Sequence, residues 1–234
     1  MTLEDFNSER PKPKVYLPEV RAIIDIINSE GKDESKDFLK KREKDLAGMS
    51  AKKDTLHHSQ RMTNLGYLLA KHRNFSEEEI KFFVEICLLH DIGKIQLPQK
   101  YLARPFGKFS AKDLEVVRKH SIQGYAHLKQ EKRSPRVYNP ILIHHEFQEQ
   151  PYPDTKASVL KLMEDMEDID VDNARLLAMI DVFDRRIFGS SNIPPQPREQ
   201  AEEGLKEQFN QPGDEEVINF LFDQCKTIRE FSQN

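Results

Sequence analysis

The stretch LLHDIGKIQLPQ, residues 88–99, decides how the rest of this sequence is interpreted. It ends a run of apolar residues at helical spacing that begins at Ile80 and continues through Leu88 to Asp91. We therefore expect Asp91 on the apolar side of a helix that Gly93 stops. A buried carboxylate costs several kcal/mol unless a cation or strong donors compensate it. The inward position of Asp91 therefore predicts that a positive group faces its carboxylate inside the protein.

Two other segments place carboxylates toward the predicted core. Asp54 and His58 lie one helical turn apart in a helix expected over residues 52–72, and this spacing lets two side chains reach one ion. Asp181 lies on the apolar stripe of a later helix and also needs compensation. Asp184, one turn further on, is either an acceptor behind the first layer of ligands or an acid on the helix surface.

The remaining histidines enlarge this set. For His120, which follows two basic residues, a surface position and a ligand role are equally good explanations until its partners are counted. The doublet His144-His145 ends a short apolar helix expected over residues 139–146, where two imidazoles have little packing purpose. With His58, His90 and the inward carboxylates, the set is too large for one ion and predicts two or three. Nitrogen and oxygen donors without a thiolate favour iron or manganese over structural zinc.

A family resemblance appears in the motifs that carry these residues. In chain order they are HSQRM (58–62), LLHDIGKIQLPQ (88–99), KHSIQG (119–124), HHE (144–146) and DVFD (181–184). Their order and separations resemble the HD-GYP group of HD-domain phosphohydrolases. The resemblance covers roughly residues 50–190, and the combination is far more specific than a lone His-Asp pair.

The resemblance implies a helical bundle that holds two or three divalent transition-metal ions, with Asp91 bridging two of them. The implied ligands are His58, His90, Asp91, His120, His144, His145 and Asp181. Asp54 matches the position where some relatives hold a third ion with a glutamate. A hydroxide bridging two cations is a strong nucleophile near neutral pH, and Lys94 would neutralise charge on the phosphate or the leaving oxygen. We expect a phosphodiesterase for a cyclic nucleotide or dinucleotide, with cyclic di-GMP as the leading candidate.

The substrate-binding segments depart from the family pattern. Relatives that cleave cyclic di-GMP usually follow HHE with xxDGxGYP, whereas this chain has FQEQPYP at residues 147–153, which keeps Tyr152 but neither glycine. The loop must have another shape, because glycine lets a backbone adopt positive φ and approach a ligand closely. An Arg-Pro-Tyr-Arg/Lys run is also missing after the DVFD helix. Arg185 and Arg186 stand there instead, although such arginines are more often solvated or salt-bridged.

We take Asp91 and Lys94 as catalytic candidates, and Lys94, Tyr152 and Arg185 as residues that bind the nucleotide substrate. Two other functions stay open. The absence of the Arg-Pro-Tyr-Arg/Lys run suits an HD-type nucleotide phosphomonoesterase. A catalytically silent module that binds a nucleotide or docks a protein partner, through the polar arm at residues 1–14, would keep the metals without turnover.

Composition supports an all-α fold. The chain has 234 residues and only 9 glycines, and helical periodicity recurs while alternating strand-like runs are scarce. We expect an HD-domain bundle with a small N-terminal helical extension and a C-terminal helix. The arm and extension would occupy residues 1–50 and the phosphohydrolase domain residues 51–234. Additional helices are expected over residues 18–28, 35–46 and 155–167.

Charge and hydropathy limit the partners. With a net charge of -4 at pH 7, the chain has no basic excess that indicates binding to a nucleic-acid duplex. No apolar run approaches the roughly 20 residues that span a bilayer, and the first residues lack a signal-peptide core, so we expect a cytoplasmic protein. Cys87 and Cys225 fall in helical apolar patterns and are expected to be buried without a disulfide.

One acidic segment and three histidines carry no predicted site. The segment DIDVDN, residues 168–173, starts like a calcium loop but lacks the glycine and the final glutamate that such a loop needs. His57, His72 and His127 match no motif and are expected at the surface or behind the ligands.

Overall fold

The computed structural model of the chain describes residues 16–30, 50–98, 100–101, 109–149, 151–152, 161, 166–189 and 194–233. Side chains are described for these residues except 28–30, 50–56, 226 and 228–233. The helix expected over residues 35–46, most of that over 155–167 and the arm at residues 1–14 lie outside this part of the chain.

The described residues form helices and loops, with no β-strand among them, so the all-α prediction is confirmed. In chain order the elements are α2 (Pro18–Glu30), α4 (Ser50–His72), α5 (Glu77–Leu89), the 3-10 helix η1 (Ile92–Gln96), α7 (Ala111–Arg118), α8 (His120–Gln130), α9 (Pro135–Ile143), α11 (Asp168–Phe188), α12 (Arg198–Gln208) and α13 (Asp214–Gln233). Ser76 and Ser110 form capping boxes with Glu79 and Asp113 and start α5 and α7. The DIDVDN segment is the beginning of α11 rather than a calcium loop.

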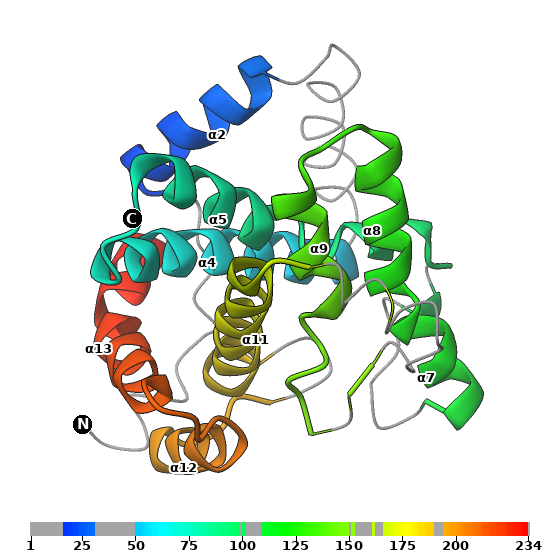
Figure 1. Cartoon of the computed structure of the whole chain (residues 1–234). Helices are drawn as coiled ribbons and strands as arrows, with labels where there is room; N and C mark the ends of the chain where they lie inside the picture. The colour runs from blue at the N-terminus through cyan, green and yellow to red at the C-terminus, as the bar shows by residue number, and fades with distance from the viewer. Residues whose placement is uncertain are drawn as a thin grey trace.

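Helix α4 lies at the centre of the bundle, because it packs against α5, α11 and α13. Figure 1 shows α11 between the α8–α9 pair and α13, with α12 below it. Helix α2 covers α5 with the buried side chains of Val20, Ile24 and Ile27, as expected for residues 18–28. The division of the chain at residue 50 stays a prediction.

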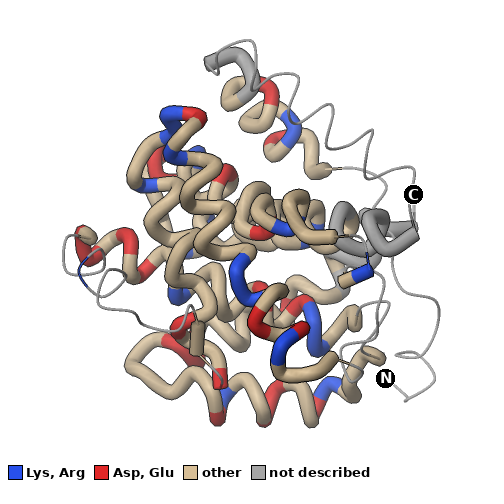
Figure 2. The backbone as a smooth tube through the Cα atoms, turned by 90° about the vertical axis from the view of Figure 1, so that its right-hand side faces the viewer, with Lys and Arg blue, Asp and Glu red and all other residues tan. Residues whose placement is uncertain are grey.

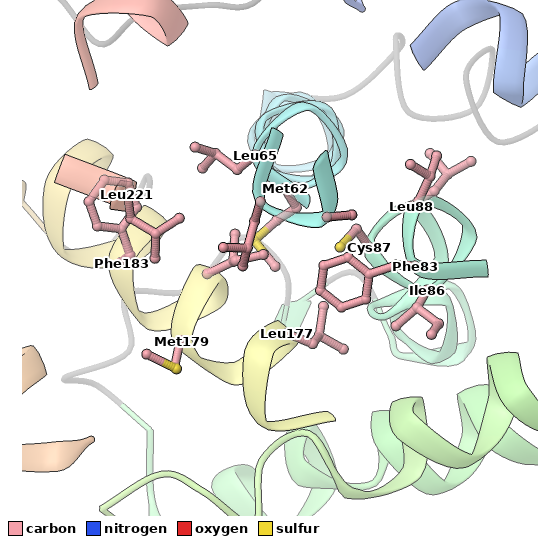
Figure 3. Packing of buried hydrophobic residues seen from close by; sticks show 14 of the residues in the cluster. Met62, Leu65, Phe83, Ile86, Cys87, Leu88, Leu177, Met179, Phe183 and Leu221 are labelled. Carbon is pink, nitrogen blue, oxygen red and sulfur yellow. The ribbon is translucent and has the colours of Figure 1, made fainter. Parts of the chain in front are cut away.

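One hydrophobic core joins these helices and leads directly to the polar centre. Met62 of α4 and Leu177 of α11 are fully buried in this core, together with Phe83 of α5 (Figure 3). Each such side chain contributes about 1.5–3 kcal/mol by leaving water. His58 lies one turn before Met62, and Asp181 lies one turn after Leu177. The faces that form the core therefore also carry these two polar side chains inward.

Two of the predicted helices have other bounds in the structure. Helix α5 ends at Leu89, before Gly93, which lies inside η1. Glycine is required there because a Cβ on Gly93 would lie 1.9 Å from the carbonyl oxygen of His120. The helix expected over residues 139–146 is α9, which begins at Pro135, where the missing N–H costs no hydrogen bond, and ends at Ile143.

Charge is distributed as the composition suggests. Figure 2 shows acidic and basic residues interspersed along the described chain. Cys87 and Cys225 are buried and unbridged, as expected. In the part of the chain that is described, no helix is both long and apolar enough to cross a bilayer.

Candidate metal centre

Five places in the fold bring the predicted ligands together. Helix α4 supplies one histidine, the junction of α5 and η1 supplies a His-Asp pair, the start of α8 and the end of α9 supply three histidines, and α11 supplies one aspartate. These residues are His58, His90, Asp91, His120, His144, His145 and Asp181. None of them is more than 9% exposed, so the surface alternative for His120 is excluded.

The ligand atoms form two groups, each small enough to hold one ion. In the first, ligand atoms of His58, His90 and Asp181 all lie within 4.8 Å of one another. In the second, the same limit holds for His120, His144 and His145. A pair of neighbouring groups fits the expectation of more than one metal ion.

Asp91 lies between the two groups. Its Oδ1 is 3.3 Å from Nε2 of His120, in the second group. Its Oδ2 is 3.6 Å from Nε2 of His90 and 3.9 Å from Nε2 of His58, in the first group. One carboxylate thus faces both groups, which is the geometry that a bridging ligand needs.

Three of the histidines are oriented by backbone carbonyls three residues earlier. Nδ1 lies 2.9 Å from Cys87 O in His90, 2.8 Å from Val117 O in His120 and 2.7 Å from Ile141 O in His144. A carbonyl only accepts, so Nδ1 donates and Nε2 of each neutral ring keeps its lone pair. Metal-binding histidines are typically held in this way.

His58 is oriented by a carboxylate instead. Its Nδ1 donates to Asp184 Oδ2 over 2.6 Å, and Asp184 also accepts two hydrogen bonds from Arg61. Asp184 is fully buried, so it is the acceptor behind the ligands and not a surface acid. Nε2 of His58 then faces Nε2 of His90 at 3.1 Å.

Burial keeps most of these histidines in the neutral form that binds metals. It lowers the pKa of His90 and His144 to about 4 and that of His120 to about 3. His58 differs: burial opposes its protonation, but Asp184 and Asp181 overcome this and raise its pKa above 6.5.

The carboxylates of the centre are ionised. Burial opposes ionisation of Asp91, but Lys94 and the neighbouring histidines hold its pKa well below 3.8. Arg185 and His58 do the same for the pKa of Asp181. The centre therefore combines neutral imidazoles with anionic carboxylates, which is a ligand set for divalent cations.

Three buried polar atoms without a hydrogen-bond partner in the described part of the chain also indicate that the centre can bind cations. His144 Nε2, His145 Nδ1 and Asp91 Oδ1 are buried and have no hydrogen-bond partner among the described residues. Each unsatisfied buried group costs about 1–3 kcal/mol, and a cation would satisfy all three. Cys87 and Cys225 belong to neither group, so both groups offer only nitrogen and oxygen. The residues present thus fit two divalent ions.

The three predicted substrate residues border the centre. Lys94 Nζ lies 2.5 Å from Asp91 Oδ2, and its side chain is 19% exposed. Arg185 Nε lies 2.8 Å from Asp181 Oδ1, and its side chain is 31% exposed. Tyr152 stacks on His145, with ring centroids 4.2 Å apart. All three side chains therefore contact residues of the centre.

Other predicted residues are placed differently. Asp54 lies in α4 one turn before His58, but its side chain is outside the described part of the chain. Arg186 forms an ion pair with Glu149 and bonds Gln196, so the salt-bridged interpretation of this arginine is confirmed.

Three residues near the centre were not singled out from the sequence. Arg61 bonds Asp184, Gln148 Nε2 lies 3.2 Å from Asp181 Oδ2, and Arg118 lies over the Tyr152 ring. Arg61 follows His58 by three residues on the same helix face, and this spacing could have revealed it. The other two depend on contacts between distant segments.

A known family model covers the part of the chain that forms the centre. The family model of the HD domain matches residues 55–186, more than half of the chain. The chain belongs to the HD domain family. The matched segment of this HD domain protein contains every predicted ligand from His58 to Asp181. Proteins of this family are metal-dependent, and both groups of ligand atoms fit that property.

Two curated relatives match this HD domain protein in part. It is 33% identical over 128 residues to the cyclic di-GMP phosphodiesterase response regulator RpfG of Xanthomonas campestris pv. campestris, covering 53% of this chain and 31% of the relative. It is 29% identical over 174 residues to the 3'3'-cGAMP-specific phosphodiesterase 2 of Vibrio cholerae, covering 73% of this chain and 31% of the relative. The chain spans about a third of the length of either relative.

A solved structure shares the fold. The HD domain of the L. monocytogenes phosphodiesterase PgpH superposes with a TM-score of 0.51 at 14% identity, covering 75% of this chain and 93% of that chain. The likeness supports the helical architecture of an HD domain.

Proposed function

We propose that this protein is a metal-dependent phosphodiesterase that hydrolyses a cyclic nucleotide or dinucleotide, with cyclic di-GMP as the leading candidate. The observation that carries the proposal is that the carboxylate of Asp91 lies between two groups of buried ligand atoms. The printed names of both curated relatives, a cyclic di-GMP phosphodiesterase and a 3'3'-cGAMP-specific phosphodiesterase, support the substrate class.

The seven predicted ligands would hold two divalent ions, and iron or manganese suits a set of imidazoles and carboxylates. Bound there, two such ions supply an activated water for attack on phosphorus and compensate the charge of the phosphoryl oxygens. A third ion near Asp54 stays a prediction. The chain itself contributes rigid orientation, because backbone carbonyls and Asp184 fix four of the histidine rings.

The bordering side chains would bind and orient the phosphodiester. Lys94 is beside Asp91 and can donate to an oxygen that gains charge during the reaction. Arg185 is partly exposed and can turn one edge of its guanidinium to a phosphate while Nε holds Asp181. Tyr152 limits the space next to His145.

Turnover of defined substrates tests the proposal. The purified chain with Mn²⁺ or Fe²⁺ is incubated with cyclic di-GMP, with 3'3'-cGAMP, and with the synthetic pair bis(p-nitrophenyl) phosphate and p-nitrophenyl phosphate. We expect a linear dinucleotide from at least one cyclic substrate and faster cleavage of the synthetic diester than of the monoester. Asp91→Asn should lower turnover by more than about 100-fold, since it removes the group shared by both sets of ligands.

His72→Gln is the matched control, because His72 lies outside the centre, where it bonds Glu216 and stacks on Phe220. Cleavage of the monoester alone would replace the proposal with an HD-type phosphomonoesterase. Binding of a cyclic dinucleotide that is recovered intact would indicate a binding module. A purified chain that binds no metal and cleaves no substrate would contradict the proposal that it is an enzyme. A protein partner for residues 1–14 and the cytoplasmic location stay predictions.

A further inference from the structure

One histidine of the centre is held differently from the others. His58, His90, His120 and His144 each have Nδ1 bonded to a carboxylate or a backbone carbonyl. Within the described residues, Nδ1 of His145 has no hydrogen-bond partner, and its Nε2 contacts Nε2 of His120 at 3.0 Å. Among the residues that the structure describes, no carbonyl or carboxylate accepts a hydrogen bond from this fifth ring.

Tyr152 provides the missing constraint. Its ring stacks on that of His145 with centroids 4.2 Å apart and an interplanar angle of 23°. The same tyrosine meets His120 edge-on, with centroids 6.0 Å apart. A stacked ring in this position restricts rotation of the imidazole, which a hydrogen bond does for the other four.

Arg118 anchors the tyrosine in turn. Its guanidinium carbon lies 5.3 Å from the centre of the Tyr152 ring, within the range of a cation–π contact. Arg118 is the last residue of α7 and stands two positions before His120. The contact thus ties Tyr152 to the segment that delivers another histidine of the same group.

We propose that Tyr152 is a positioning residue that orients His145 for the ion held with His120 and His144. The inference rests on the proposed two-ion centre and assigns a role to a residue of the loop that departs from the family pattern. The aromatic ring carries the effect. A phenylalanine should therefore replace the tyrosine, and an aliphatic residue should not.

The alternative for Tyr152 is a direct contact with the substrate, such as stacking on a nucleobase. That role predicts a raised KM with unchanged metal affinity. Positioning predicts a loss of metal affinity in the absence of any nucleotide. Metal binding without substrate therefore separates the two roles.

Titration with Mn²⁺, followed by the electron paramagnetic resonance signal of the free ion, measures this affinity. We expect the full-length wild type to bind two ions. Tyr152→Leu should weaken one of them by about 10-fold or more, the range for loss of a group that orients a ligand, and leave the other within about twofold. Tyr152→Phe should keep both within about twofold.

Tyr67→Leu is the control for loss of a tyrosine ring, since Tyr67 is a partly exposed residue of α4 that packs against the hydrophobic core and belongs to neither group of ligand atoms. As a second readout, the visible absorption of bound Co²⁺ should change for one of two ions in Tyr152→Leu and for neither in Tyr152→Phe. Two tightly bound Mn²⁺ ions in Tyr152→Leu would overturn the positioning role and leave the proposed function standing. A wild type that binds no Mn²⁺ would overturn both.

Discussion

The Nε2 atoms of His58 and His90 lie 3.1 Å apart in the protein interior, although both rings donate from Nδ1 to other groups. Two neutral rings in this arrangement direct lone pairs at each other. Either a proton or a cation between them removes the repulsion. Asp184 and Asp181 raise the pKa of His58, whereas burial lowers that of His90, so a proton is held more readily by His58 than by His90.

Metal removal should therefore destabilise the protein. At an ion concentration 100 times Kd, each bound ion adds about 2.7 kcal/mol to the free energy of unfolding. For a chain of this size, that shifts Tm by about 5–10 °C per ion. Calorimetry after dialysis against EDTA, with and without added Mn²⁺, measures the shift. His72→Gln should show the same shift as the wild type. A Tm that does not change when Mn²⁺ is added would contradict a metal centre.

The free energy of unfolding of the metal-free protein should decrease as the pH is lowered from 6.5 to 4. In this window the unfolded chain protonates His90, His120 and His144, whereas the folded chain does not, because burial lowers their pKa values to about 4, 3 and 4. Burial also lowers the pKa of His145 well below 6.5, so unfolding takes up about four protons and the slope is about 5 kcal/mol per pH unit.

His58 acts in the opposite direction and at higher pH. Its raised pKa gives the folded protein stability that is fully present below pH 6.5 and is lost as pH rises through the folded value. Urea unfolding of EDTA-treated protein at pH 4.5 to 8 measures both trends. An unfolding free energy that is constant from pH 6.5 to 5 would contradict the burial of neutral histidines.

Asp184→Asn should weaken one ion selectively. Asp184 accepts from Nδ1 of His58 and from Arg61, and loss of such a partner typically lowers metal affinity 10- to 100-fold. The ion held with His120 should keep its affinity, because none of its ligands contacts Asp184 in the described structure. Mn²⁺ titration distinguishes the two ions, and equal weakening of both would show a general loss of structure instead.

Lys94→Met should separate metal binding from turnover. Lys94 pairs with Asp91 in the metal-free protein and so competes with a cation for this carboxylate. Its removal should leave Mn²⁺ affinity unchanged or tighter, while kcat falls by about 100- to 1000-fold through loss of a charge-stabilising donor. Lys129→Met on the exposed side of α8 is the control. Unchanged kcat in Lys94→Met would exclude Lys94 from catalysis.

Helical patterns predicted that Asp91 and Asp181 point inward, but the full set of residues that meet, His120 included, was predicted from the family resemblance. Asp181 continues the stripe that contains Leu177, and His90 and Asp91 directly follow α5. The structure brings seven of the eight predicted ligands together, and the side chain of the eighth, Asp54, lies outside the described part of the chain. Their role as metal ligands stays a prediction.

The division into two groups and the orientation of each ring could not be predicted. Both depend on contacts between segments that are distant in sequence, such as that of His58 with Asp184 or of His145 with Tyr152. The end of α5 was misplaced for a related reason. Gly93 is required by the approach of His120 from another helix and not by the end of its own.

The most direct test of the central claim is to locate metal ions in crystals of the protein grown with Mn²⁺, by anomalous diffraction. We predict two peaks, one bounded by His58, His90 and Asp181 and the other by His120, His144 and His145, with the carboxylate of Asp91 contacting both. A single peak away from Asp91, or no peak within this cluster, would contradict the account.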